Sequence, residues 1–249
     1  MTMARGGQSR VRTATVVAGK EVLRDPVLLG LLVFLPVYFI GLWGWLVPTD
    51  EVRVAVATAD GTATVDTDLV SLMLALMGPV TGALLVGIAG MFLVQRSRGI
   101  DERLRVVGFR GAELLVARLC LLAAVTAVVV AVSLAVTLVY SVPEHPGWFL
   151  LSLVVAGATY GSVGVLAGQF IDRMAGVYLL LFVPMFDILL LGLPLGESPG
   201  WADWLPGHHA AELAVSASLS ETVAVSHAGW GVVVVAVVSA VALLASLVQ

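Results

Sequence analysis

Long runs of apolar residues, separated by short polar segments, make up most of the chain. Each run is close to the length of about 20 residues with which an α-helix crosses a hydrocarbon core of about 30 Å. Six such runs cover residues 27–47, 69–94, 119–140, 148–171, 177–195 and 228–248. The pattern therefore predicts an all-α, polytopic integral membrane protein with six transmembrane helices in a single domain, residues 1–249.

Two segments outside these runs have patterns of their own. In residues 1–26, apolar side chains at helical spacing share one face with basic residues around them, which predicts an amphipathic helix in the membrane interface. In the acidic segment 48–68, the sequence VRVAVAT alternates between apolar and other residues, as is typical of a short strand.

The composition excludes a soluble domain, and the placement of charge predicts the topology. Only 12% of the residues are charged and mean hydropathy is +1.03, whereas soluble domains average about 25% charged residues. Five Lys or Arg residues precede the first run, six lie in residues 95–118 and one is Arg173, while only Arg53 falls on the other face. Basic loops stay in the cytoplasm, so we expect a protein of the cell membrane with both termini cytoplasmic.

Residues 95–118 are the only long charged segment between two apolar runs, with six arginines against three acids. An apolar row at Ile100, Leu104 and Val107 recurs at helical spacing and predicts a short amphipathic helix. The remaining faces carry charged residues: Asp101, Glu102, Arg103 and Arg105. Such a helix either rests on anionic lipid headgroups or docks into a soluble partner.

Asp187 is the only ionisable side chain well inside a predicted span. Because a charge at membrane depth is costly, such a residue is a candidate functional site. It could face a cavity, pair across a dimer, lie in a water-exposed turn next to Pro184, or be a satisfied structural acid. Tyr160 and Gln169 place further polar groups on the fourth run, where hydrogen bonds between helices are the expected role. The three residues form the candidate intramembrane polar site.

Other chemistry is not predicted by the sequence. His208 and Glu212 share a helical face next to His209, but the sequence places no third ligand and HExxH is absent, so we expect no metal site. A phosphate loop of the GxxxxGK[ST] type is also absent, which excludes nucleotide hydrolysis by this chain. The absence of a Ser-His-acid arrangement argues against an intramembrane protease. We expect no catalytic residues, no cofactor and no nucleic-acid partner.

Three stretches resemble the permease subunits of ABC type-2 transporters. KEVLRDPVLLGLLVFLPVYF (residues 20–39) is similar to the family's interfacial helix followed by Pro and a first span with its own proline. RSRGIDERLRVVGFRGAELLVAR (96–118) resembles the segment between the second and third spans. LPGHHAAELAVSAS (205–218) resembles the short outer re-entrant helices before the last span.

The resemblance implies a transport function. The segment between the second and third spans would be a coupling helix that docks into a separate ATPase, which binds the ATP. The docking residues would be Arg96, Arg98, Gly99, Ile100, Asp101, Arg103, Leu104, Arg105 and Val107. A second permease copy or a paralogue would complete the transporter, and export is the expected direction. The alternative is a membrane scaffold or sensor that recruits a cytoplasmic partner through the basic loop; a secondary transporter is disfavoured because no inverted repeat is evident.

Overall fold

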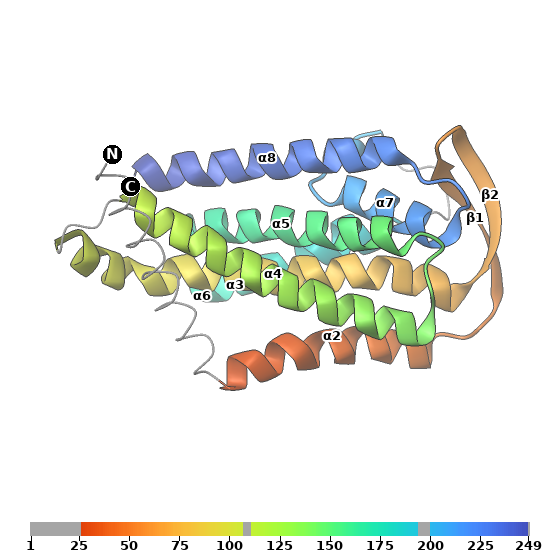
Figure 1. Cartoon of the computed structure of the whole chain (residues 1–249), viewed down its shortest axis with the longest axis horizontal. Coiled ribbons are helices and arrows are strands. Elements are labelled where there is room, and N and C mark those ends of the chain that lie inside the picture. The colour runs from red at the N-terminus through yellow and green to blue at the C-terminus, as the bar shows by residue number, and fades with distance from the viewer. Residues whose placement is uncertain (1–25, 107–110, 194–199, 249) are drawn as a thin grey trace, which may run out of the picture.

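The computed structural model describes residues 26–106, 111–193 and 200–248, most of which are helical (Figure 1). The helices are α2 (Pro26–Leu46), α3 (Leu69–Val106), α4 (Gly111–Tyr140), α5 (Pro146–Phe170), α6 (Arg173–Pro184), α7 (His208–Leu219) and α8 (Val225–Val248). Two shorter helices are η1 (Met185–Leu190), a π-helix, and η2 (Ala202–Trp204), a 3₁₀-helix. The interfacial helix expected over residues 1–26 lies outside the described residues, apart from Pro26, where α2 begins.

Five helical segments of the described chain are long and apolar enough to cross a membrane. They are Leu69–Arg96, Arg118–Tyr140, Pro146–Phe170, Arg173–Leu190 and Val225–Ser246. The apolar part found in α2, Leu32–Leu46, is shorter than these. The chain is thus a mostly α-helical membrane protein, as the apolar runs predict, and five of the six predicted spans meet the length and composition of a membrane-crossing helix.

A β-hairpin adds strand structure to the predicted all-α fold. Strands β1 (Glu51–Thr58) and β2 (Gly61–Asp68) pair antiparallel, with Glu51 opposite Asp68 and Thr58 opposite Gly61. Gly61 has φ +129° in the tight connection, a backbone conformation that only glycine adopts without strain. The alternation of VRVAVAT predicts a strand, and the structure has β1 there. Two of its alternating valines, Val54 and Val56, lie in the hydrophobic core.

The predicted second span and the start of the predicted amphipathic helix are one continuous helix. α3 runs for 38 residues from Leu69 to Val106, through Pro79 and without a break at the end of the apolar run. Its carboxyl end and the amino end of α4 lie at the end of the bundle opposite the hairpin (Figure 1). We call this the arginine end, because Arg96 lies there and residues 97–106 continue the helix beyond it.

The predicted fifth span, residues 177–195, begins earlier and ends earlier in the structure. α6 starts at Arg173, where the Asp172 side chain accepts the N–H groups of Met174 and Ala175 and so caps the helix. Directly after Pro184 the helix widens into the π-helix η1, which ends at Leu190. Single π-helical turns within membrane-crossing helices often occur at functional positions.

α3 lies at the centre of the bundle and α8 at its edge. In the most apolar part of α3, 89% of the residues are buried, against 17% in α8. α3 and α5 approach closely through glycines: a Cβ on Gly164 would overlap the carbonyl oxygen of Gly87, and one on Gly168 would lie 2.8 Å from that of Met91. These glycines therefore allow α3 and α5 to pack with their backbones in contact.

Candidate functional site

Asp187 and Tyr160, two of the predicted polar residues, meet in the interior of the bundle. Asp187 lies in η1 with 1% of its surface exposed, and Tyr160 on α5 is fully buried. The Tyr160 hydroxyl donates a short hydrogen bond to Oδ2 of Asp187. The backbone N–H of Gly207 donates to the same oxygen at 2.6 Å. The acid is therefore paired within the chain, and it is neither in a water-exposed turn nor dependent on a second copy.

The contact with Gly207 depends on the absence of a side chain there. A Cβ at this position would lie 2.6 Å from Oδ2 of Asp187 and 2.5 Å from Cγ1 of Ile188, closer than real side chains come. Gly207 immediately precedes α7, so the carboxylate of Asp187 faces the amino end of that helix. The helix dipole and the free N–H groups favour a negative charge at this end.

The other carboxylate oxygen of Asp187, Oδ1, is buried and has no hydrogen-bond partner among the described residues. Asp187 thus joins α5, η1 and the start of α7 through one oxygen and leaves the second available. We call Asp187, Tyr160 and Gly207 the carboxylate centre. The sequence indicated Asp187 and Tyr160 but not Gly207. Gly207 is in LPGHH, and its role at the start of α7 becomes visible only when the beginning of that helix is known.

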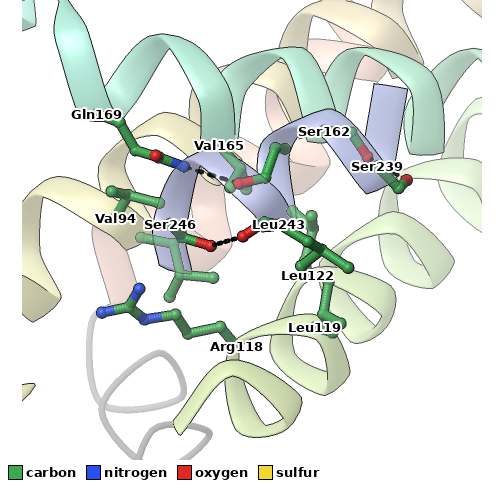
Figure 2. Close-up of a pocket in the computed structure, with 12 residues that line it drawn as sticks. Val94, Arg118, Leu119, Leu122, Ser162, Val165, Gln169, Ser239, Leu243 and Ser246 are labelled. Atoms are coloured by element: carbon green, nitrogen blue, oxygen red, sulfur yellow. Dashed lines mark hydrogen bonds between the residues drawn. The ribbon is translucent and has the colours of Figure 1, made fainter. Parts of the chain in front are cut away.

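Gln169, the third predicted polar residue, lies apart from the carboxylate centre. Its Nε2 donates to the carbonyl oxygen of Ala242 at 3.1 Å and so links α5 to α8. Ser162 on α5 and Ser239 on α8 form a second link at 2.8 Å. Both links border a cavity of about 30 Å³ that Arg118 and Leu119 of α4 also line (Figure 2). The predicted role of Gln169 in hydrogen bonding between helices is confirmed.

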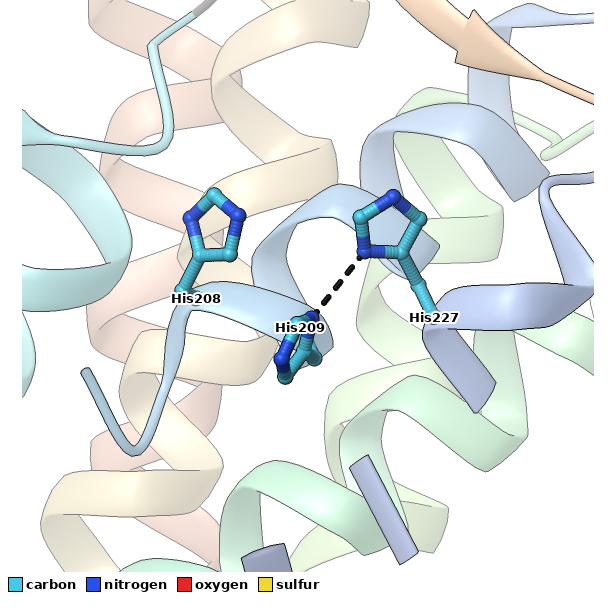
Figure 3. Close-up of side chains that lie close together, drawn as sticks. All are labelled: His208, His209 and His227. Atoms are coloured by element: carbon cyan, nitrogen blue, oxygen red, sulfur yellow. Dashed lines mark hydrogen bonds between the residues drawn. The ribbon is translucent and has the colours of Figure 1, made fainter. Parts of the chain in front are cut away.

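Three imidazoles gather directly beside the carboxylate centre. His208 and His209 open α7, and His227 comes from the first turn of α8 (Figure 3). One ring nitrogen from each can be chosen so that all three lie within 4.8 Å of one another. Nδ1 of His209 and Nδ1 of His227 are 3.2 Å apart. We call these residues the histidine cluster.

The surroundings of the two imidazoles of α7 favour their neutral form. Burial lowers the pKa of His208 and of His209, and Asp203 opposes this only in part. Asp203 belongs to η2, and its Oδ1 lies 3.2 Å from Nε2 of His208. Glu212, which the sequence pairs with His208, is not part of the cluster, and burial raises the pKa of its carboxyl. Neutral imidazoles present lone pairs, the form in which histidine binds metal ions.

His227 and Asp203 were not recognised from the sequence as neighbours of His208 and His209. His227 is separated from the HH pair by the rest of α7 and the loop after it, and the packing of α7 against α8 brings it close. Asp203 precedes the pair in η2, and the turn before α7 places it beside His208. The available signal was composition: the chain has four histidines, and three of them lie between residues 208 and 227. That clustering indicates proximity along the chain but no geometry.

The predicted docking residues are described only in part. Arg96 is exposed at the end of the membrane-crossing part of α3. The backbone from Arg98 to Arg105 is helical as part of α3, and Val107 lies outside the described residues. The expectation that the row from Ile100 to Leu104 is helical is therefore confirmed for the backbone, as a continuation of the span.

Comparisons with protein-family models, with curated proteins and with solved structures found no match to this chain. The fold itself places the chain in the class of helical membrane proteins. The features of the described residues that bear on function are the long α3, the β-hairpin, the carboxylate centre and the histidine cluster.

Proposed function

We propose that the chain is the membrane-spanning permease subunit of an ATP-binding cassette transporter of the ABC type-2 kind. It has six spans, with α2 as the first, and both termini in the cytoplasm of a prokaryotic cell. A separate subunit binds and hydrolyses ATP. Support comes from the apolar helices, from the resemblance of residues 20–39, 96–118 and 205–218 to that family, and from the bias of basic residues to one face.

The observation that carries this proposal is the length of α3. Its 38 residues make a helix about 57 Å long, whereas the hydrocarbon core is about 30 Å thick. The membrane-crossing part ends at Arg96, so residues 97–106 project from the arginine end as a continuous helix. A stiff helical extension that carries Arg98, Arg103 and Arg105 is suited to transmit a push from a docked partner into the bundle.

Charge favours a protein partner with an acidic rim. The projecting segment carries Arg98, Arg103 and Arg105 beside two residues of the apolar row, Ile100 and Leu104. An apolar row bordered by positive charge complements a groove with acidic edges, where charge pairing sets orientation and specificity. In this mechanism, closure of the ATPase dimer on ATP moves the projecting segment, and the spans tilt to open an outward path between this chain and a second permease chain.

The exposed faces leave room for that second chain. α8 presents a row of large apolar side chains that nothing in the described chain covers, among them Val233, Val237 and Leu244. Lipid covers such a face in a monomer, and a second permease copy or a paralogue covers part of it in a transporter. The substrate would be exported along the boundary between the two permeases.

Charge reversal on the projecting segment tests the proposal. The double variant Arg103→Glu and Arg105→Glu should lose copurification of the ATPase and at least tenfold of the ATPase activity that the permease stimulates in reconstituted vesicles. The matched control is Arg53→Glu, the same chemical change on the exposed hairpin, where Arg53 pairs with Asp66 at 2.7 Å. It should keep both properties. If no ATPase copurifies with the wild-type chain, or the double variant behaves like the control, the transporter assignment fails in favour of a scaffold.

A further inference from the structure

The spacing of the histidine cluster matches that of ligands on one metal ion. A zinc ion binds imidazole nitrogen at about 2.0–2.1 Å, so two nitrogens of a tetrahedral site lie about 3.3 Å apart. Nδ1 of His209 and Nδ1 of His227 are 3.2 Å apart, and the three chosen ring nitrogens stay within 4.8 Å of one another. Small side-chain rotations would bring all three within reach of one ion.

A fourth group stands beside the three imidazoles. Asp203 approaches Nε2 of His208 at 3.2 Å, a distance that fits a second ligand of the same ion as well as a carboxylate that holds a ligating histidine. The Asp203 side chain is 64% exposed, whereas His208 is 4% exposed. A largely exposed carboxylate therefore stands directly beside the buried imidazole of His208.

Hydrogen bonding within the cluster does not account for the arrangement. A bond between His209 and His227 satisfies one nitrogen of each ring. Nδ1 of His208 remains buried, with no hydrogen-bond partner among the described residues. Buried polar atoms are rarely left in this way, and a bound ion or water usually satisfies them.

We propose that His208, His209 and His227 bind one divalent transition-metal ion of the zinc class, with His208 binding through Nδ1 and Asp203 holding the His208 ring through Nε2. Nitrogen ligands suit zinc, copper and nickel, whereas magnesium and calcium require oxygen ligands. The site would tie the first turn of α7 to the first turn of α8, which are separated along the chain by the rest of α7 and by residues 220–224. The proposal of a metal site does not depend on the proposed transport function.

The ion would also act on the carboxylate centre. His208 follows Gly207 directly, and Gly207 donates to Asp187. A metal that fixes His208 therefore fixes the start of α7 against η1. Binding to the folded chain raises its stability by mass action, so the metal should raise the unfolding temperature as its concentration rises.

The test uses the full chain in detergent, purified through a tag without histidine and stripped with a chelator. Titration with ZnCl₂ should give one ion per chain in the wild type. His209→Gln and His227→Gln should each weaken binding at least tenfold. The matched control is His145→Gln, which changes the one histidine outside the cluster; its Nε2 pairs with the Glu221 carbonyl at 2.9 Å, and binding should stay unchanged.

Thermal unfolding provides a second measurement on the same samples. Zinc should raise the unfolding temperature of the wild type and of His145→Gln, and should leave His227→Gln unchanged, while magnesium should shift none of them. The site is disproved if the wild type binds no zinc, if His145→Gln loses as much affinity as the cluster variants, or if zinc stabilises His227→Gln as it does the wild type. Because the wild-type result alone can overturn the proposal, poor folding of a variant does not leave it undecided.

Discussion

Oδ2 of Asp187 accepts hydrogen bonds from two other elements, α5 and the residue before α7. The stability of the protein should therefore be sensitive to the loss of this acceptor. Replacing Asp187 with Ala leaves the Tyr160 hydroxyl and the Gly207 N–H buried without a partner. Each such group costs about 1–3 kcal/mol. We expect Asp187→Ala to lower the free energy of unfolding by about 2 kcal/mol or more, measured in detergent by thermal unfolding with tryptophan fluorescence.

Asp187→Asn separates hydrogen bonding from charge. Both donors use the same oxygen, so the amide oxygen of Asn can take that place and accept both bonds. Stability should therefore stay close to that of the wild type, and any loss of transport in this variant would then report on the charge. If Asn destabilises the protein as much as Ala does, the hydrogen bonds are not what holds the centre together.

The sequence allowed only part of the carboxylate centre to be predicted. An acid inside an apolar run is conspicuous, so Asp187 was found, and a tyrosine on another run was a reasonable partner. Gln169 was grouped with them although it lies nine positions beyond Tyr160 on the same helix, which separates the two by about 13 Å along its axis. Hydropathy shows that a residue is at membrane depth, but not which neighbouring helix it faces.

The contact between α3 and α5 depends on glycine backbones at van der Waals distance. Gly164 faces the carbonyl oxygen of Gly87, and a backbone atom cannot rotate away as a side chain can. We expect Gly164→Ala to push the two helices apart and to cost about 1–3 kcal/mol, the usual effect of overpacking. The unfolding temperature and the yield of folded protein should both fall.

Gly229→Ala in α8 is the matched control, because nothing lies within 4 Å of a Cβ built at that position. Alanine favours helices over glycine by about 1 kcal/mol, so this variant should be as stable as the wild type or more stable. Equal destabilisation by the two substitutions would mean that α3 and α5 do not pack as closely as described.

The helices were predictable to within a few residues where apolar runs end at charges or prolines, as at Asp172 and Pro146. The continuity of α3 was not predictable, because a helix that leaves the membrane loses its apolar signal while its backbone continues. The second strand was also missed: GTATVDTD has few large apolar residues, although the Asp60-Gly61 pair is a strong hairpin signal. Such elements depend on pairing and packing that composition does not show.

The bundle has two chemically different ends, and this predicts its orientation. The hairpin at one end is acidic, whereas the opposite end carries Arg96 and Arg173. In a Cys120→Ser background, which removes the only cysteine, Ala59→Cys on the hairpin should react with a membrane-impermeant maleimide in intact cells. Arg96→Cys should react only after the membrane is opened.

Ala59 and Arg96 are both exposed, so unequal labelling cannot be assigned to burial. Labelling of both in the denatured protein provides the control for intrinsic reactivity. Reaction of Arg96→Cys in intact cells would place the arginine end outside and would remove the docking role proposed for α3.

The unbroken length of α3 has a mechanical consequence. A helix without a break that packs against α5 along its buried length, as where Gly87 meets Gly164, moves as one body. Displacement of the arginine end of α3 by a few ångströms would therefore also move Leu69, where the hairpin joins the helix. The hairpin end of the bundle would then respond to an event at the arginine end without any signal passing from side chain to side chain.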